Sequence, residues 1–302
     1  MNITNHQNLS ECWVNAIKKL YDKEERKGFW QSPTSLLQPP RKIFLESRHW
    51  NELSVDAADC VWLLLGQAVH SVLESTASNN VIAEQRFILP FMKREIGFKP
   101  DRVEMVKGAI VDIRDFKITQ IYAWKNFESK HEWIRQLNWY AWGLFRLGFK
   151  PRKLSVEMLL KDWDLSDMIR SEPNDYPRTP IVSKDVPLLP YDIIEKDVRE
   201  RVDLFIQCEN LPDDQLPDCT EEERWADKNV WCVKKVETGR TVPKGLKETK
   251  EEAEAFIADK KNKEDYRIEF RQGQNRRCMK YCAACSVCGQ YMKILRKQLE
   301  NS

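Results

Sequence analysis

The stretch GFKPDRVEMVKGAIVDIRDFK, residues 97–117, decides how this chain is interpreted. Lys107-Gly108 is a turn-type dipeptide between two apolar-polar runs, so we expect a β-hairpin with strands 102–106 and 109–117. Asp101 stands directly before the first strand, and Asp115 lies near the end of the second. The stretch therefore predicts two carboxylates brought together by one hairpin.

Strand alternation sorts the acids of the second strand. Side chains at every second position share a face, so Asp115 and Lys117 point the same way. Asp112 points the opposite way, and we expect it to be solvent-facing or paired with Arg114.

Composition and length bound the class of protein. The chain has 302 residues, of which 42% are hydrophobic and 32% charged, enough for a full core. We expect an α/β fold in which residues 1–209 form the main domain and residues 210–302 a small α+β appendage with a cysteine segment. The net charge of +2 gives no global basic field. A nucleic-acid partner would have to be attracted by local patches and metal ions.

Targeting signals are not apparent. The first 30 residues lack a signal-peptide pattern, and no run of 18 apolar residues indicates a membrane span. Four of the nine cysteines crowd into residues 278–288, which favours a metal or cluster site in a reducing cytoplasm over disulfides.

Hydrophobic periodicity gives the coarse secondary structure. Helices are expected at 9–27, 56–78, 128–147 and 191–207, and strands at 81–92 and 153–160. The proline-rich residues 173–190 are expected to form an extended surface loop. Residues 210–223 are expected to be a linker, followed by a β-α-β unit with elements at 230–236, 249–259 and 266–270.

Two of these helices carry polar side chains at spacings of four. Gly66 and His70 stack on one face of helix 56–78, where a mid-helix glycine usually marks close packing. In helix 128–147, Gln136 and Tyr140 leave the same face. The expected buried stripe of that helix is Trp133, Leu137, Tyr140, Leu144 and Leu147.

The acids suit a divalent metal. Mg²⁺ and Mn²⁺ prefer oxygen ligands in octahedral geometry, which Asp101, Asp115 and the carbonyl of Phe116 can supply. An imidazole from His70 would shift the preference toward Mn²⁺. Lys117 could then orient or deprotonate an attacking water and stabilise charge on a phosphate.

The order of these residues resembles the PD-(D/E)XK nuclease superfamily, and most of all its RecB-like exonuclease branch. The resemblance rests on Gly66/His70, Asp101, Asp115-Phe116-Lys117 and Gln136/Tyr140 and covers roughly residues 32–149. It implies a restriction-endonuclease-like core, with a central mixed sheet flanked by helices. It also implies that His70, Asp101 and Asp115 bind metal, that Lys117 is catalytic, and that Gln136 and Tyr140 contact DNA near the scissile phosphate. Glu84 matches an acid often seen before the first core strand.

The cysteine segment offers a second site. Cys278, Cys282, Cys285 and Cys288 can hold a 4Fe–4S cluster or Zn²⁺, although the same spacings also fit an apolar helix face. Cluster-bearing relatives pair one early cysteine with three near the C-terminus. Pro39 stands at the early position here, so either the extra Cys285 or a distant cysteine such as Cys232 would complete the set.

The sequence thus predicts a Mg²⁺- or Mn²⁺-dependent deoxyribonuclease, more an exonuclease than an endonuclease, acting in DNA processing or recombination. Its size resembles stand-alone phage or CRISPR-associated members, which would place it in the host cytoplasm. The partners expected are DNA ends or single strands, together with a recombination protein. The alternatives are a non-catalytic DNA-end-binding recombination partner with the same fold and a structural zinc protein.

Local basic groups and tryptophans are the candidates for DNA contacts. Trp124, Trp139 and Trp142 could stack on single-stranded bases. The candidate phosphate contacts are Lys93, Arg94, Lys99, Arg102, Arg146, Lys150, Arg152, Lys153, Arg276 and Arg277.

Overall fold

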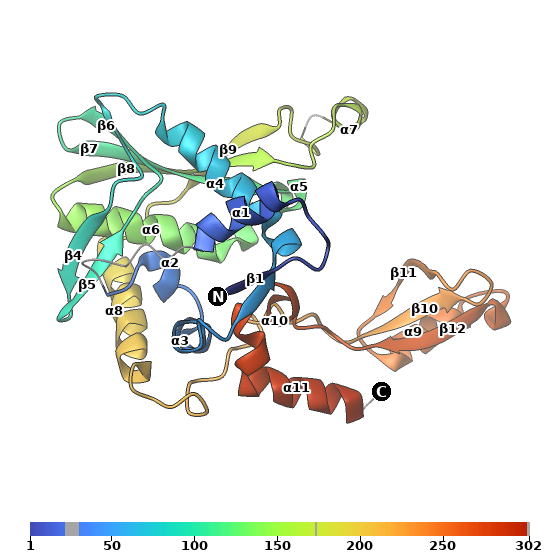
Figure 1. The fold of residues 1–302 in the computed structure, drawn as a ribbon. Helices are drawn as coiled ribbons and strands as arrows, with labels where there is room; N and C mark the ends of the chain where they lie inside the picture. The colour runs from blue at the N-terminus through green and yellow to red at the C-terminus, as the bar shows by residue number, and fades with distance from the viewer. Residues whose placement is uncertain (22–29, 173, 301–302) are drawn as a thin grey trace.

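The computed structural model describes residues 1–21, 30–172 and 174–300, so residues 22–27 of the first expected helix lie outside the described residues. The fold is α/β, with a mixed central sheet flanked by helices (Figure 1). Five strands form this sheet in the order β3-β6-β7-β8-β9. Their bounds are Val81–Ala83, Arg102–Lys107, Ile110–Thr119, Lys150–Leu160 and Ile181–Val186. Only β7 and β8 are parallel, and the other pairs are antiparallel.

The predicted hairpin is confirmed as β6 and β7. Arg102 pairs with Arg114, and Gly108 takes the positive φ of +56° that the turn requires. β7 then continues past Arg102, the first residue of β6. Its last residues therefore pair with β8 on one edge, and their other edge is not paired with β6. The strand β9 occupies part of residues 173–190, where the prediction of a continuous loop is wrong because β8 offers this segment a free edge.

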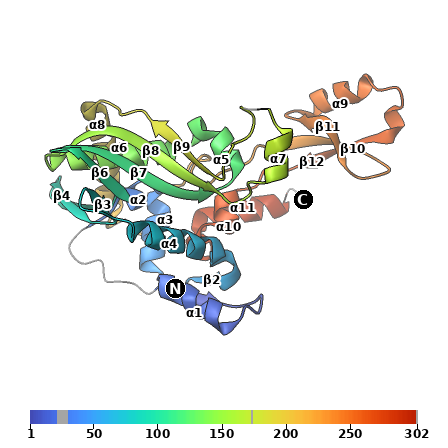
Figure 2. The same cartoon turned by 90° about the horizontal axis from the view of Figure 1, so that it is seen from above.

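Helices α6 (His131–Arg146) and α8 (Tyr191–Cys208) cover one face of the sheet (Figure 2). Val111 and Ile113 of β7 and Val156 and Met158 of β8 are fully buried on this face. Leu137, Tyr140 and Leu144 of the expected stripe are buried in α6, whereas Leu147 is exposed and Trp133 half-buried. Apolar burial on this face supplies the main core.

A bent β-ribbon leads into the sheet. β4 (Phe87–Phe91) and β5 (Arg94–Phe98) pair with the same register as β3 and β6, with Phe87 opposite Phe98 and Ala83 opposite Arg102. Between the two paired parts the ladder breaks, and Glu84 takes a positive φ of +50°. The expected single strand 81–92 is therefore two strands. The hairpin turn at Met92-Lys93, with both φ values positive, was not predicted.

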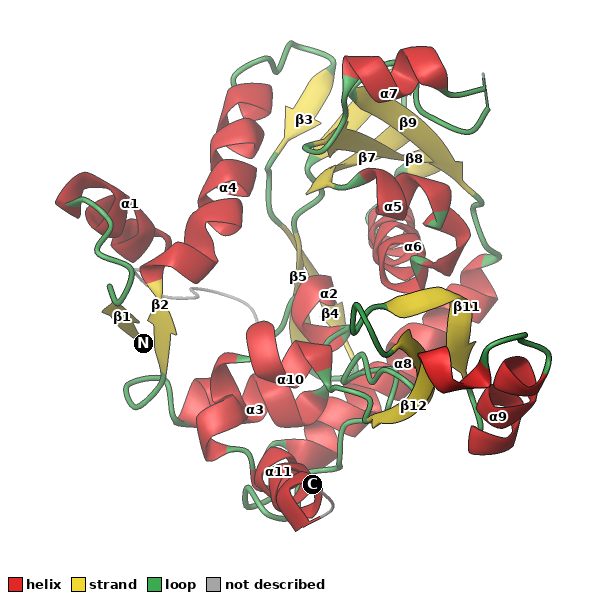
Figure 3. Ribbon diagram, turned by 90° about the vertical axis from the view of Figure 1, so that its right-hand side faces the viewer, coloured by secondary structure: helices red, strands yellow, loops and turns green. Residues whose placement is uncertain are grey.

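The N-terminal part packs beside the ribbon (Figure 3). It contains β1 (Asn2–Thr4), α1 (Glu11–Tyr21), α2 (Pro33–Leu36), α3 (Pro40–Arg48), β2 (Ser54–Asp56), η1 (Ala57–Cys60) and α4 (Val61–Glu74). The expected helix 56–78 is shorter in the structure, and none of the residues of α4 is buried. A Cβ added at Gly66 would meet no atom within 4 Å, so the prediction of close packing there is wrong.

After β7 come α5 (Ile121–Lys125) and η2 (Phe127–Ser129), and α7 (Leu165–Arg170) follows β8. The C-terminal appendage is a three-stranded antiparallel sheet, β11-β10-β12, with one helix and a short η3 turn (Lys263–Asp265). Its bounds are β10 (Val230–Lys235), β11 (Thr241–Lys247), α9 (Lys250–Ala258) and β12 (Tyr266–Arg271). The predicted β-α-β unit missed β11. The appendage projects away from the main body in Figures 1 and 2.

The chain then returns to the main body. α10 (Arg276–Lys280), η4 (Ala283–Val287) and α11 (Gly289–Glu300) close the chain, and η4 contacts α3. Ala284 and Cys288 belong to the main core, and the division of the chain at residue 210 stays a prediction. Among the described residues, no helix combines the length and apolarity needed to span a membrane.

Two helix glycines provide a matched test of packing. A Cβ on Gly143 of α6 would lie 2.7 Å from the Phe98 ring, which is fully buried, whereas one on Gly66 of α4 meets open space. We expect Gly143→Ala to lower the free energy of unfolding by about 1–3 kcal/mol through overpacking. Gly66→Ala should raise it by up to about 1 kcal/mol through helix propensity. Urea denaturation measures both, and equal effects would contradict this packing.

Candidate metal centre

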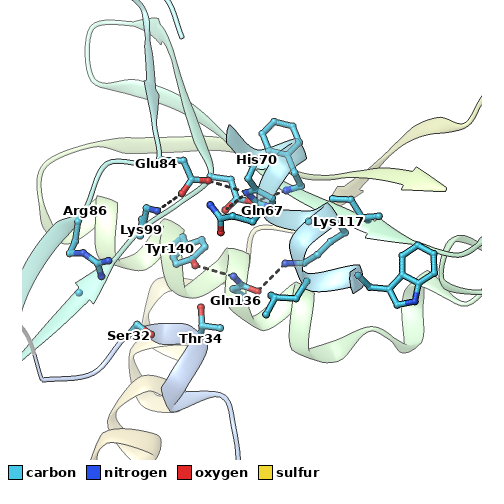
Figure 4. Close-up of a pocket in the computed structure, with 17 residues that line it drawn as sticks. Ser32, Thr34, Gln67, His70, Glu84, Arg86, Lys99, Lys117, Gln136 and Tyr140 are labelled. Carbon is cyan, nitrogen blue, oxygen red and sulfur yellow. Dashed lines mark hydrogen bonds and ion pairs between the residues drawn. The ribbon is translucent and has the colours of Figure 1, made fainter. Parts of the chain in front are cut away.

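The candidate site is a cavity of about 470 Å³ between α4, α6, the end of β7 and the bend of the ribbon (Figure 4). Such a volume suits a small ligand or a few groups of a larger one. Nearly all of the predicted site residues line it or lie against it. The lining residues that matter below are Trp62, Gly66, His70, Glu84, Lys99, Asp101, Phe116, Lys117, Gln136 and Tyr140.

The register of the ribbon places Glu84 opposite Asp101, at the point where the ladder breaks. The Glu84 amide donates to the Asp101 carbonyl at 3.1 Å, which keeps the ribbon register across the break. The side chains of both residues turn into the cavity. Glu84 is held by His70 Nδ1 at 3.0 Å and by Lys99 Nζ at 2.5 Å. His70 Nδ1 also lies 3.8 Å from Asp101 Oδ1, so α4 and the ribbon meet at these three side chains.

Asp101 is tied to the far end of β7. Its Oδ2 accepts a hydrogen bond of 2.7 Å from the Phe116 amide. Because the N–H and C=O of one strand residue point to the same edge, the Phe116 carbonyl faces the Asp101 side as well. This edge is open because β6 pairs with β7 only as far as Arg114.

Asp115 is the most deeply buried acid of the site. It is 2% exposed, and neither carboxylate oxygen has a hydrogen-bond donor. Lys117 Nζ lies 2.7 Å from Asp115 Oδ2 as an ion pair, without the directional geometry of a hydrogen bond. Buried carboxylates normally accept several hydrogen bonds, and an unsatisfied one is costly. An oxygen pair in this state is suited to a cation.

Helix α6 supports the lysine. Lys117 Nζ lies 3.4 Å from Gln136 Oε1, and Gln136 Nε2 donates to Tyr140 Oη at 2.9 Å. The predicted pair at a spacing of four thus forms a chain from Tyr140 through Gln136 to Lys117 and Asp115. Figure 4 shows this chain on the opposite side of the cavity from His70 and Glu84. No DNA contact of Gln136 or Tyr140 follows from these bonds.

Burial and neighbouring charges shift the pKa values of Asp101, His70 and Lys117. Burial, together with the negative charge of Asp115, raises the pKa of Asp101 to about 7. The bond to Glu84 raises the pKa of His70. Burial lowers the pKa of Lys117, but the attractions of Asp115 and Asp101 together outweigh it, and the net shift of the pKa is upward. Two acids that repel each other in a buried site would both be stabilised by a shared cation.

Within the described residues, His70, Glu84 and Asp101 form the group of His, Cys, Asp or Glu whose ligand atoms all lie within 4.8 Å of one another. Asp115, a predicted ligand, is not a member of this group, although its charge acts on Asp101. Glu84 matches the sequence pattern but does not belong to the predicted ligand set. The signal that would have included it is its non-glycine positive φ, which sequence alone does not give.

Asp112 lies outside the cavity, as strand alternation predicts, but its environment was predicted wrongly. It is 8% exposed and forms an ion pair with Arg152 at 2.6 Å. Arg114 instead contacts Glu104 and Glu157. The parallel strand β8 supplies Arg152 and Glu157, and this pairing across a long connection is invisible in the local sequence.

Most of the residues predicted to contact DNA are buried or form ion pairs with acids. Trp139 and Trp142 are 1% and 0% exposed in the core, so their assignment to base stacking is wrong. Among the predicted phosphate contacts, Lys99 lines the cavity. The members that form ion pairs with acids are Arg94, Lys99, Arg102, Arg146, Arg152, Lys153, Arg276 and Arg277.

The cysteine segment folds against α3. All nine cysteines are free thiols, and Cys232 is buried within β10 of the appendage. Cys219, which the sequence did not single out, lies near Cys278 and Cys288, whose charges contribute to the upward shift of its thiol pKa after burial. The nearby thiols of Cys285 and Cys288 likewise act on Cys278.

Comparison with known proteins leaves the family open. No family model and no curated protein matches the chain. A crystal structure of SSO0001 is similar over 64% of this chain and 84% of that chain, with 15% sequence identity and a TM-score of 0.42. A likeness at this level carries no argument about fold family or function.

Two buried acids of β7, Asp115 and Asp112, provide a matched test of the cation site. We expect Mn²⁺ to raise the melting temperature of the wild type, since a ligand at 100 times its Kd adds about 2.7 kcal/mol. Asp115→Asn should remove this shift, because a neutral amide replaces a charged oxygen ligand. Asp112→Asn, outside the cavity, should keep the shift. A full Mn²⁺ shift in Asp115→Asn would exclude Asp115 as a ligand.

Proposed function

We propose that this protein is a metal-dependent DNA nuclease, acting on DNA ends, with a restriction-endonuclease-like core of the PD-(D/E)XK type. The observation that carries the proposal is Asp115, a buried carboxylate without a hydrogen-bond donor, beside Asp101 and Lys117 at an open cavity. A structural ion pair would bury and satisfy all of its polar atoms. This one leaves both acid oxygens without a hydrogen-bond donor next to Lys117, which lines the cavity.

The donor set fits Mg²⁺ or Mn²⁺. Asp101, Asp115 and the Phe116 carbonyl would hold the ion, with His70 and Glu84 on the far side of Asp101. All but the imidazole are hard oxygen donors, as these cations require. When bound, the ion would act as a Lewis acid on a phosphate oxygen and make bound water a nucleophile near neutral pH.

The protein's own residues would orient the reacting groups. Lys117, held between Asp115 and Gln136, presents an ammonium group that can donate to a phosphate oxygen as negative charge builds. Gln136 and Tyr140 would fix the direction of that ammonium group, in addition to any contact with DNA. Lys99 and Arg86 add basic groups to the cavity wall for the approaching phosphate backbone.

Cleavage of end-labelled linear DNA in Mn²⁺ or Mg²⁺ tests the proposal. Lys117→Met should lower the rate about 10²–10³-fold, as loss of one transition-state donor does, while the Mn²⁺ melting shift persists. Lys153→Met is the control, because Lys153 pairs with Asp185 outside the cavity. Wild-type protein that cleaves neither single- nor double-stranded ends would contradict the proposal. Metal-dependent DNA binding without cleavage would favour the non-catalytic end-binding alternative.

We further propose that a metal group, a 4Fe–4S cluster or Zn²⁺, is held by Cys219, Cys278, Cys285 and Cys288. Burial raises the thiol pKa of Cys219, Cys278 and Cys285, and neighbouring thiols of this set add to each shift. For Cys282, the charge of Glu46 of α3 acts on the pKa after burial, and that of Cys278 comes last. We take the cluster as the first candidate, since four thiolates in this segment suit it, and zinc as the alternative.

Hydrogen bonds bring Cys219 to the C-terminal segment. Gln290 of α11 both accepts from the Cys219 amide at 2.9 Å and donates to its carbonyl at 2.8 Å. The buried Arg41, next to the position where Pro39 and Pro40 stand, donates to the carbonyls of Leu216 and Pro217. Cys219 thus approaches the position at which the early cysteine of cluster-bearing relatives would lie. Cys219 could therefore supply the ligand that Pro39 does not.

Metal content tests this ligand set. Protein purified without oxygen should contain iron and absorb in the iron–sulfur range. Cys219→Ser should lose both signals, whereas Cys232→Ser and Cys282→Ser should retain them. Loss in Cys282→Ser together with retention in Cys219→Ser would restore the four C-terminal cysteines as the ligands. Stoichiometric zinc without iron would exclude the cluster.

A further inference from the structure

One face of α4 leads from the acid site to the outside of the molecule. Trp62, Gly66 and His70 follow one another at spacings of four, and all three line the cavity. Residues four apart stack on one helix face, so Trp62 lies two turns, about 12 Å, from His70 along the axis. The indole is 58% exposed. Trp62 thus offers a large exposed aromatic surface at the edge of the cavity.

Gly66 keeps the path between them open. A Cβ at this position would meet no atom within 4 Å, so the glycine does not serve to let another element approach. Glycine lowers helix stability relative to alanine and therefore needs another reason. The space it leaves connects Trp62 with His70 and the acids along the wall of one cavity.

A cation accompanies the indole. Lys161, just after β8, places Nζ 3.7 Å from the centroid of the Trp62 ring. The positive charge of Lys161 thus lies against the Trp62 ring. The part of the ring that stays exposed can stack on a planar group. The pairing of an aromatic platform with a cation matches a nucleotide, whose base stacks and whose phosphate is anionic.

We infer that Trp62 is a stacking platform for an unpaired base, so that the cavity takes a single-stranded DNA end. The inference rests on the proposed function for the chemistry at the acids, and it names Trp62 as a positioning residue. An unpaired base would stack on the indole, Lys161 would contact the neighbouring phosphate, and the strand would pass Gly66 to reach Asp101 and Asp115. A paired base in a duplex does not offer its face in this way.

A protein partner is the competing occupant of α4. The helix also exposes Val61, Leu65 and Val72, which a partner surface would cover. These three do not line the cavity, whereas Trp62 lines it with the acids and with Leu63, a fourth exposed apolar residue of α4. The position of the indole and its adjacent lysine favour the nucleic acid.

Fluorescence anisotropy with a labelled oligothymidylate of about 12 nucleotides tests the inference, with an abasic oligonucleotide of equal length as the second probe. Trp62→Ala should weaken oligothymidylate binding about tenfold or more and leave abasic binding unchanged. Trp62→Phe should restore most of the affinity. Trp13→Ala is the matched control, because Trp13 is 55% exposed but does not line the cavity.

Equal weakening for both probes, or no weakening for either, would overturn the inference. A change in self-association or protein capture with unaltered DNA affinity would assign the face to a protein instead. The binding assay needs no cleavage, so its result is separate from that of the nuclease test. Binding through Trp62 without cleavage would retain this inference and reject the nuclease. Cleavage together with normal oligothymidylate affinity in Trp62→Ala would retain the nuclease and reject this inference.

Discussion

The unsatisfied carboxylate of Asp115 is the constraint on which the site depends. Strand positions 111 and 113 are fully buried against α6, so the register that packs the core also drives the acid at 115 inside. A slip of one residue would move Val111 and Ile113 off the face against α6 and place Asp112 and Arg114 there instead. The core therefore fixes the position of the acid, and the cost of its burial is the consequence. Lys117, on the same face, offsets part of that cost.

The bent ribbon supplies the other half of the site. In an unbroken ladder, Glu84 and Asp101 would be an ordinary cross-strand pair with fully hydrogen-bonded backbones. The break between β3 and β4 instead leaves the two acids in the cavity, where His70 and Lys99 balance them. Strain at Glu84, with φ of +50°, accompanies this placement. At Glu84, backbone distortion and charge thus occur together on the wall of the cavity.

Local rules recovered the elements that carry the chemistry. Strand alternation placed Asp115 and Lys117 together and Asp112 apart, and the turn at Gly108 gave the hairpin. A helical spacing of four correctly paired Gln136 with Tyr140. What failed depends on residues distant in sequence. Arg152 reaches Asp112 across the β7–β8 crossover, β9 forms because β8 has a free edge, and Trp139 and Trp142 are buried by α8. The periodicity of α4 correctly indicates a helix, but it does not say that the apolar residues would remain uncovered in the described part of the chain.

The short α2–α3 segment links the two candidate centres. Thr34 of α2 lines the acid cavity, and α3 begins four residues after α2 ends and packs on η4, within the cysteine segment. Arg201 of α8 holds the carbonyls of Leu36 and Gln38 between these two helices, and Arg277 contacts the Gln38 side chain. The segment is therefore fixed from both the core and the C-terminal side. A group bound by the thiols would stiffen the wall of the acid cavity through this contact, while taking no part in the chemistry there.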